Sequence, residues 1–540
     1  MQAVSLKEEG MNRQSLHRRP SRSLAIAAIS AGLCLALAGA IAQFSRPPIV
    51  SAQGTTNLVE YSYRRAREVL DAARRAYGLT DATPGIDDVS FKINGKLYAR
   101  QQSFTPDAHD ARPVTAQLTV DLKTDAITWD VQTSFPGGFE ISQTVLLKGD
   151  QGTVFNRLLK TSQPLPPPNP SREFLLNRIP QSFLARATAR ANTLRWLGET
   201  DFQGRKHNAI SFATASGTEL ALFFDARTNL LSKFETLVSD PYLGDAVNEF
   251  IIAGYQTIDG RPFPTGQILR TGGELAQEYQ YSDVRINSHP AASTFEAPAG
   301  YTAQTPPTVP FAVKELAKDV YMVEGMGGGA YASLFVAFND YVLVVEPTVS
   351  EATTRTLIQK IKETVPGKPI RYVVATHHHS DHMGGARAFI ADGVALVTTP
   401  GNVAYFQKFA NSRFTVQPDA QQLNPRKPLI ETVTGRKRVF TDGTHTVELH
   451  DIGPNPHAKE LLVVWLPNEK ILFEGDMFVR NPDNSIAPAI AATVQFAEAV
   501  RKMGIQPATL VDVHSRVYTM QDLQASLDLA KKNTAAGSGK

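Results

Sequence analysis

Four side chains that can bind metal ions occur within six positions, in the pattern His377-x-His379-x-Asp381-His382. Alternate residues of an extended segment point to the same side, so His377 and His379 can hold one ion together. Asp381 and His382 lie beyond the bend and can reach a second ion. Imidazole and carboxylate groups suit zinc, and also iron or manganese. The spacing predicts a metal site rather than a chance group of surface histidines.

The flanking residues are typical of a site at the end of a strand. Residues 370–375 form a short apolar run rich in β-branched side chains after Pro369, which predicts a buried strand. Gly384 and Gly385 follow the ligands and permit a tight backbone turn. The carboxyl end of a strand is where α/β folds place their sites.

This motif resembles the signature of the metallo-β-lactamase-fold hydrolases, which continues with a lone His, an Asp that ends a strand, and a last His. All three follow here in order. His457 ends a Gly-Pro-Asn-Pro-His turn, Asp476 ends a Leu-Phe-Glu-Gly-Asp segment, and His514 ends an apolar run. The resemblance covers roughly residues 310–535. It implies an α/β fold, the four-layer αβ/βα sandwich of that family.

The resemblance also implies two zinc ions per chain, with iron or manganese as alternatives. Three residues would hold each ion and a seventh would bridge them: His377, His379 and His457; Asp381, His382 and His514; and Asp476. Asp381 is expected to handle the transferred proton as well. Two positions depart from the family pattern. Ser515 and Arg516 follow the last His where Gly is usual, and Glu346, expected to be structural, stands where Asp is more frequent.

The implied reaction is hydrolysis by a hydroxide that bridges the two ions. Substrates would carry an ester, lactone, thioester or related bond and be small, with apolar ones favoured. A bridging Asp476 is typical of the family's thioesterases, lactonases and phosphodiesterases, so a β-lactamase is a minor alternative. A phosphodiesterase, a di-iron redox enzyme and a non-catalytic metal-binding or lipid-binding protein stay open. The net charge is only +3, so the chain lacks the excess of basic residues that would hold a nucleic-acid backbone.

Residues 1–52 are typical of a leader. Basic residues precede a nearly unbroken apolar run at 24–42, and small residues follow it, as in a secretory signal peptide. We therefore expect a periplasmic or secreted protein, with a permanent membrane anchor at 24–42 as the alternative. The single cysteine, Cys34, lies inside this run, so the mature protein would have no disulfide.

Residues 53–305 are expected to form a separate β-rich domain of the α+β type, with an antiparallel sheet. Alternating polar and apolar residues predict strands at 90–97, 114–122, 126–133 and 143–147, and a helical pattern runs over 171–197 with a new start at Pro180. The segments at 254–264 and 295–301 resemble parts of periplasmic lipoprotein-carrier domains, which implies an apolar ligand. A sheet that merely supports the metal domain is the equal alternative.

Residues 306–540 would form the hydrolase domain, and all metal ligands lie in it. It is therefore expected to bind both ions alone if it folds independently. The Gly-rich run at 325–330 predicts a hairpin turn, Ser350 a helix cap, and Asp442-Gly443 a second hairpin that leads to His457. His378 is expected to point away from the ions. His445 and His450, on the hairpin strands, are not expected to be ligands.

Overall fold

The computed structural model describes residues 57–81, 85–135, 139–165, 167, 170–304, 310–478, 485–514 and 517–537. Leu58–Lys540 form one compact unit. The predicted leader, including the apolar run at 24–42, lies outside the described residues. Within them, no helix has the length and apolar character needed to cross a membrane.

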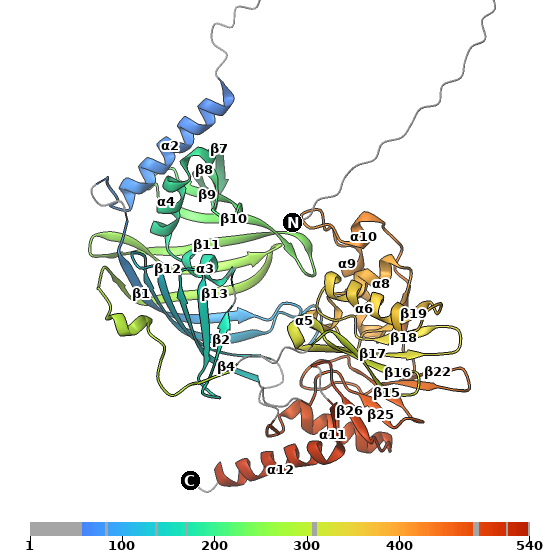
Figure 1. Ribbon diagram of the computed structural model, residues 1–540. Helices are drawn as coiled ribbons and strands as arrows, with labels where there is room; N and C mark the ends of the chain where they lie inside the picture. Colours follow the sequence, from blue (N-terminus) through green and yellow to red (C-terminus); the bar gives the residue numbers. More distant parts are fainter. Residues whose placement is uncertain are drawn as a thin grey trace, which may run out of the picture. The chain divides into compact units, whose positions relative to one another are not determined.

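The first part of the chain is built around one 14-stranded sheet (Figure 1). Its spatial order is β14-β6-β5-β4-β3-β2-β1-β13-β12-β11-β10-β9-β8-β7, and its long strands pair antiparallel. The strands are β1 (Asp88–Tyr98), β2 (Ala111–Asp121), β3 (Ala126–Phe135), β4 (Phe139–Lys148), β5 (Gln151–Asn156), β6 (Thr161–Leu165), β7 (Arg195–Phe202), β8 (Arg205–Ala213), β9 (Glu219–Asp225), β10 (Leu231–Asp240), β11 (Gly244–Ile258), β12 (Arg261–Thr271), β13 (Glu274–Ile286) and β14 (Thr302–Ala303).

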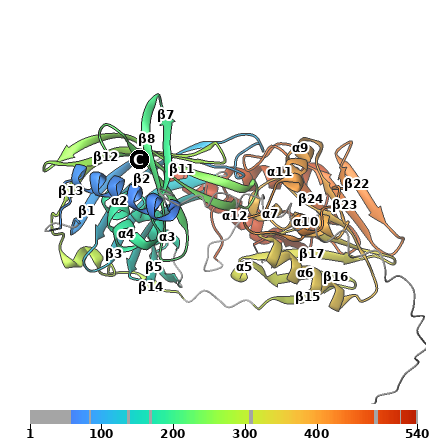
Figure 2. The ribbon, with the colours of Figure 1, turned by 90° about the horizontal axis from the view of Figure 1, so that it is seen from above.

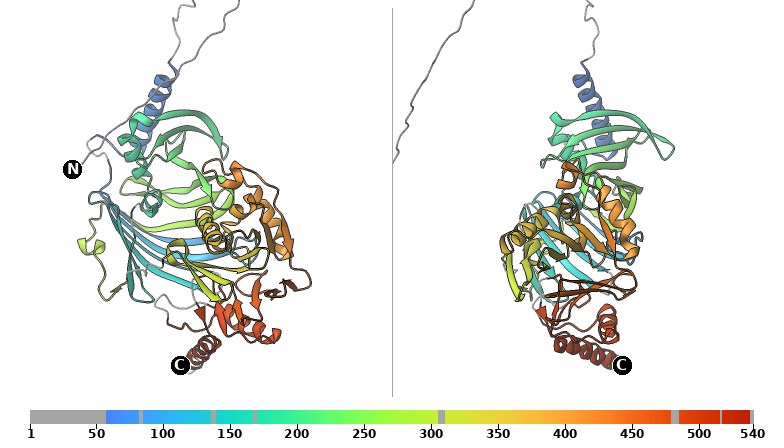
Figure 3. Two further views of the ribbon diagram at one scale, coloured as in Figure 1. Left: turned by 45° about the vertical axis from the view of Figure 1, so that its right-hand side comes forward. Right: turned by 90° about the vertical axis from the view of Figure 1, so that its right-hand side faces the viewer.

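Three helices cover this sheet: α2 (Leu58–Ala76), α3 (Pro170–Leu176) and α4 (Pro180–Ala189). Phe183 of α4 packs against Phe234 of β10, with ring centroids 4.4 Å apart, inside an apolar cluster that also takes Leu70 of α2. Leu175 of α3 belongs to a second cluster with the strands around β1. The strands bend as they run beneath these helices (Figure 3). The β-rich, antiparallel character expected of this part is confirmed.

The helical prediction for 171–197 was right at its start and wrong at its end. Pro180 begins α4, with its fixed φ suited to the first turn. The helix stops at Ala189, a short 3-10 turn follows, and Arg195 opens β7. Along β7, exposed and partly buried residues alternate, which is the period of a strand rather than of a helix.

The second part contains two sheets in separate layers (Figure 2). One has the order β15-β16-β17-β18-β19-β20-β21, and the other β22-β23-β24-β25-β26-β27. Their strands are β15 (Ala312–Ala317), β16 (Val320–Gly325), β17 (Tyr331–Ala337), β18 (Val342–Val345), β19 (Ile370–Val374), β20 (Ala395–Thr398), β21 (Ile430–Thr432), β22 (Lys437–Thr441), β23 (Thr446–Asp451), β24 (Leu462–Leu466), β25 (Ile471–Phe473), β26 (Thr509–Val511) and β27 (Val517–Tyr518).

Helices lie on the outer face of each sheet, and the two inner faces share one core. That core joins residues such as Val336 and Val345 of the first sheet to Leu449 and Val464 of the second. The outer helices are α6 (Glu351–Thr364), α8 (Ala386–Ala391), α9 (Val403–Asn411), α11 (Ala491–Met503) and α12 (Met520–Gly537), with short α5 (Met326–Gly329), α7 (Ser380–Met383) and α10 (Ala420–Leu423) in connections. The αβ/βα sandwich is confirmed.

The predicted local signals of this part are also present. The Gly-rich run turns the chain between antiparallel β16 and β17, with Gly327 and Gly328 at positive φ. Ser350 caps α6 by accepting a hydrogen bond from the Thr353 amide. Asp442 and Gly443 join antiparallel β22 and β23. The last of these hairpins sends the chain toward the loop that carries His457.

Candidate metal centre

Each predicted ligand lies on a connection that follows a strand. The first four ligands follow β19, two of them in the loop and two on α7. His457 lies between β23 and β24, Asp476 follows β25, and His514 follows β26. β19 belongs to one sheet, and β25 and β26 belong to the other. Packing of the two sheets in the sandwich brings the loops that follow these strands together at one edge.

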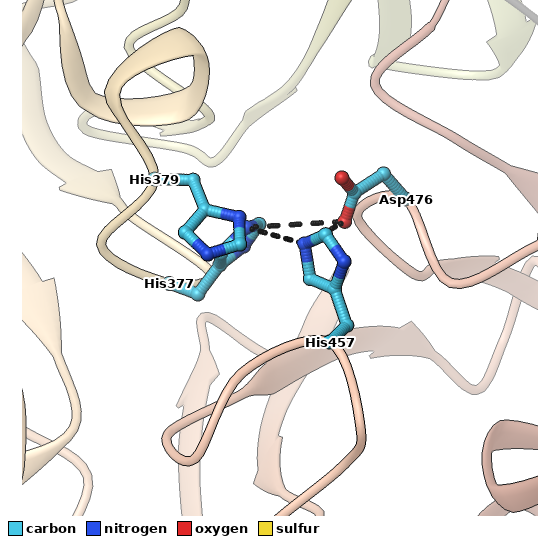
Figure 4. Close-up of side chains that lie close together, drawn as sticks. All are labelled: His377, His379, His457 and Asp476. Carbon is cyan, nitrogen blue, oxygen red and sulfur yellow. Dashed lines mark hydrogen bonds and ion pairs between the residues drawn. The ribbon is translucent and has the colours of Figure 1, made fainter. Parts of the chain in front are cut away.

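Three histidines and one carboxylate form the first group of the cluster: His377, His379, His457 and Asp476. All are buried, and each offers one ligand atom within 4.8 Å of the others. The Nε2 atoms of His377 and His457 are 3.1 Å apart. Figure 4 shows the four side chains pointing toward one another. One ion can be bound here by nitrogen and oxygen together.

Asp381, His382 and His514 form the second group, with the same spacing limit between their ligand atoms. Asp476 faces both groups. Its Oδ1 lies 3.1 Å from His457 Nε2, and its Oδ2 lies 3.3 Å from His382 Nε2. The structure therefore brings all seven predicted ligands together, with one carboxylate between the two groups.

The outward nitrogen of three histidines has a hydrogen-bond acceptor of its own. His377 Nδ1 lies 3.0 Å from the Thr376 hydroxyl, which itself donates to the Glu346 carboxylate. The other two acceptors are the Ser103 carbonyl, 3.1 Å from His379 Nε2, and the Ala330 carbonyl, 3.3 Å from His514 Nδ1. His382 Nδ1 instead lies at ion-pair distance, 3.5 Å, from Glu346 Oε1. Such acceptors fix the tautomer, so the other nitrogen of each ring keeps its lone pair for a metal.

The charges at the cluster favour bound cations. Burial and neighbouring imidazoles hold the pKa values of His377 and His379 well below the usual range, which keeps both rings neutral. Although burial opposes ionisation, three histidines hold the pKa of the Asp476 carboxyl well below its usual range. Burial also opposes charge on His382, yet Asp476, Asp381 and Glu346 raise its pKa well above normal. Neutral His377 and His379 and an ionised Asp476 are in the forms that ligate metals, whereas His382 has to release a proton when an ion binds.

Unpartnered buried atoms give a second test of fit. His379 Nδ1, His382 Nε2 and Asp476 Oδ1 are buried without a hydrogen-bond partner. Leaving such atoms unsatisfied costs about 1–3 kcal/mol each, and a divalent ion would satisfy all three. The residues present therefore fit a divalent metal site.

Three other histidines lie outside both ligand groups, and the two glycines have a different purpose from the one predicted. His378 is buried beside the Tyr405 ring, outside both ligand groups. His445 and His450 contact Glu469 and Glu448 instead.

Gly384 and Gly385 have negative φ, so a tight backbone turn does not explain why glycine occupies these two positions. A Cβ on Gly385 would lie 1.7 Å from the Thr354 hydroxyl, so close packing against α6 requires glycine there.

Glu346 has a more specific place than the structural role expected of it. It is fully buried, has a φ of 71°, and directs its carboxylate to both Thr376 and His382. Non-glycine residues seldom adopt this backbone conformation, and such strain concentrates at functional sites. A charged residue at the end of β18 was the only sequence signal for this contact.

Two further side chains at the cluster were not predicted. The Tyr331 hydroxyl donates to Asp381 Oδ2 at 3.4 Å, and its ring lies 5.1 Å from that of His514. Burial and the nearby Asp381 charge raise the Tyr331 pKa above its usual value. Gln102, from the loop between β1 and β2, donates to Asp381 Oδ1 at 2.7 Å. Tyr331 directly follows the predicted Gly-rich turn, whereas nothing in the sequence around Gln102 indicates a site.

Residues 326–535 match the family model described as "Metallo-beta-lactamase superfamily". This part of the chain is a metallo-β-lactamase superfamily domain. Membership indicates a metal-dependent hydrolase at the level of the superfamily, although the superfamily also includes non-hydrolytic members. The expected family resemblance of this part is thereby confirmed.

One curated relative and several solved structures are similar to the metallo-β-lactamase superfamily domain. The 2,4-dinitroanisole O-demethylase subunit alpha of Nocardioides sp. (strain JS1661) is 22% identical over 204 residues, 37% of this chain and 57% of that protein. This chain thus spans a little over half of the length of that relative. A metallo-beta-lactamase from Pontibacter korlensis is 20% identical (TM-score 0.32), covering 41% of this chain and 98% of its own. FIM-1 from Pseudomonas aeruginosa is 21% identical (TM-score 0.31), with 42% and 99% covered.

Proposed function

We propose that this protein is a dinuclear, zinc-dependent hydrolase that cleaves an ester, lactone, thioester or related bond of a small substrate. The position of Asp476 supports this proposal most strongly. Its two oxygens face different ligand groups, 3.1 Å from His457 Nε2 and 3.3 Å from His382 Nε2. A carboxylate shared in this way suits two ions roughly 3.5–4 Å apart, the spacing of two-metal hydrolytic sites.

Bound ions would supply a Lewis acid for the scissile carbonyl and a water that is nucleophilic near neutral pH. The protein's own residues would then manage protons and orientation. Asp381 holds one oxygen toward Gln102 and the other toward Tyr331, so it can accept the proton of the attacking water and return it to the leaving group. Because the Tyr331 pKa is raised, its hydroxyl stays protonated and continues to donate to Asp381 Oδ2.

A second candidate substrate class comes from the curated relative. By its name, that protein is the alpha subunit of a 2,4-dinitroanisole O-demethylase. An aryl methyl ether is therefore a specific alternative to the carboxylic ester, alongside the phosphodiester and β-lactam substrates that the sequence left open.

A substrate panel with zinc-loaded protein tests the proposal. The panel holds a nitrophenyl ester, a lactone, a thioester, a phosphodiester, a β-lactam and 2,4-dinitroanisole. We expect turnover of an ester, lactone or thioester that dialysis against a chelator removes and added zinc restores. Turnover of the aryl ether, phosphodiester or β-lactam alone would replace the substrate assignment, and turnover that survives chelation would refute the metal-dependent reaction.

We extend this to the location of the protein and to the 14-stranded sheet with its helices α2, α3 and α4, which we call the sheet domain. We propose export to the periplasm or cell exterior, which rests on the basic and apolar pattern of residues 1–52. We also propose that the sheet domain helps to bind apolar substrates. Phe104, 38% exposed, follows the residue whose carbonyl faces His379, which supports an apolar contact beside the metals. Phe104→Ala should raise KM for long-chain esters more than for acetates, and an equal effect on both would refute this contact.

A further inference from the structure

The connection between β1 and β2, residues 99–110, contacts the metal cluster through its backbone. We call it the 99–110 loop. The Gln101 carbonyl accepts from the Ser380 amide at 3.0 Å, and the Phe104 carbonyl accepts from the Lys459 amide at 2.8 Å. The first contact lies between two metal ligands in sequence, and the second lies two residues after His457. The loop therefore joins the two segments that carry most of the first ligand group.

The Ser103 carbonyl sets the orientation of one ligand ring. A carbonyl can only accept, so His379 Nε2, 3.1 Å away, must carry the proton. The other nitrogen, Nδ1, then keeps its lone pair, and it is buried without a hydrogen-bond partner. Both groups are almost completely enclosed, since Ser103 is 0% and His379 is 1% exposed. The loop thus holds His379 in the tautomer that can ligate through Nδ1.

The Gln102 side chain orients the carboxylate of a second ligand. Its Nε2 donates to Asp381 Oδ1 at 2.7 Å and to the Ser380 hydroxyl at 3.2 Å. Asp381 Oδ2 is left facing His382 Nε2, 3.9 Å away, which belongs to the same ligand group. Without the amide, the carboxylate would keep the longer bond from Tyr331 to Oδ2, at 3.4 Å, but lose the bond that fixes Oδ1.

The 99–110 loop is itself held rigidly by the sheet domain. The Ser103 hydroxyl accepts from the Asp110 amide at 2.9 Å, and the Phe104 amide donates to the Asp110 carboxylate at 2.7 Å. The buried Arg112 of β2 donates to the Gln102 carbonyl at 3.0 Å and to the Ser134 carbonyl at 3.2 Å. These bonds place Gln102 with little freedom before any ion binds.

A second junction holds the same two parts of the chain together. The Tyr242 ring stacks on Tyr405 at 4.3 Å between centroids, and the Asp245 carboxylate accepts from the amides of Thr415 and Val416 at 2.7 and 2.8 Å. Both residues of the sheet domain lie where β10 passes into β11. The contacts of the 99–110 loop are thus not the sole link across this boundary among the described residues.

We propose that the 99–110 loop is an integral part of the metal centre and that Gln102 is the positioning residue for Asp381. This inference rests on the proposed dinuclear function. It revises the expectation that residues 306–540 bind both ions alone: they carry every ligand, but the sheet domain orients two of them.

The test uses the full chain and two substitutions, Gln102→Ala and Gln102→Met. The second keeps the side-chain length but removes the donor, so it separates the hydrogen bond from packing. Gln163→Ala, whose side chain contacts Gln304 within the sheet domain, is the matched control. Zinc affinity is measured by competition with a chelator, and the Co²⁺ form is examined by its visible absorption spectrum.

We expect both Gln102 variants to bind the more weakly held of two zinc ions about 10–100-fold less tightly, the usual effect of losing an orienting partner. Their Co²⁺ spectra should change and their melting temperatures should match the control. Wild-type affinity and spectrum in both variants, with two ions bound, would refute the inference and leave the proposed function intact. A wild-type chain that binds no zinc would refute both.

Discussion

Replacing Asp476 by asparagine isolates the one residue shared between the two ligand groups. The change keeps the shape of the side chain but turns one oxygen into an amide nitrogen, which cannot ligate a metal. Because the two oxygens face different groups at 3.1 and 3.3 Å, the variant must lose one of these contacts and its negative charge. We expect it to retain about one ion where the wild type holds two.

The size of the effect on activity follows from the loss of one ion. A bound ion stabilises charge in the transition state by several kcal/mol, and about 1.36 kcal/mol corresponds to a tenfold change in rate. A loss of about 3–4 kcal/mol therefore predicts a fall in kcat/KM of about 10²- to 10³-fold. Asp476→Ala, which removes both oxygens, should lose at least as much.

Elemental analysis and kinetics on the same preparations provide the assay. Asp528→Asn makes the same chemical change on the exposed face of α12 and serves as the matched control. Two ions per chain in Asp476→Asn, with kcat/KM within about threefold of the control, would refute the shared role of this carboxylate.

Three other changes test separate parts of the structure. Glu346→Gln removes the charge beside His382 Nδ1, so zinc should bind about 10–100-fold more weakly in a chelator competition; unchanged affinity would return Glu346 to a purely structural role. His378→Ala should keep both ions by elemental analysis while lowering the melting temperature, because the ring is buried outside both ligand groups; loss of metal would contradict the alternating ligand pattern. The mass of the protein recovered from its native host should lack a leader that includes residues 24–42, whereas an intact N-terminus would indicate an anchor.

The ligand set could be predicted because its signals are local in sequence. The pattern from His377 to His382 is continuous, and the three later ligands each follow a recognisable strand or turn. The apolar runs of β19, β25 and β26 predicted the strands that carry them. Once the chain forms a two-sheet sandwich, these strand ends meet at one edge, so the cluster follows from the topology.

The contacts around the ligands could not be predicted in the same way. Gln102 and Asp381 are 279 residues apart, and no periodicity or motif marks a lone Gln in a loop as a partner. The end of α4 was missed for a related reason: residues 190–197 are compatible with a helix, but pairing with β8 makes Arg195–Phe202 a strand. The helix α2 was not predicted either, although Ala66, Val69, Leu70 and Ala73 recur at helical spacing on its buried face and gave a local signal for it.

Anomalous diffraction from crystals of the zinc-loaded protein tests the central claim most directly. We expect two peaks roughly 3.5–4 Å apart. One should lie within bonding distance of His377, His379 and His457, the other of Asp381, His382 and His514, with Asp476 between them. A single peak, or two peaks of which either lies away from these side chains, would contradict the dinuclear centre.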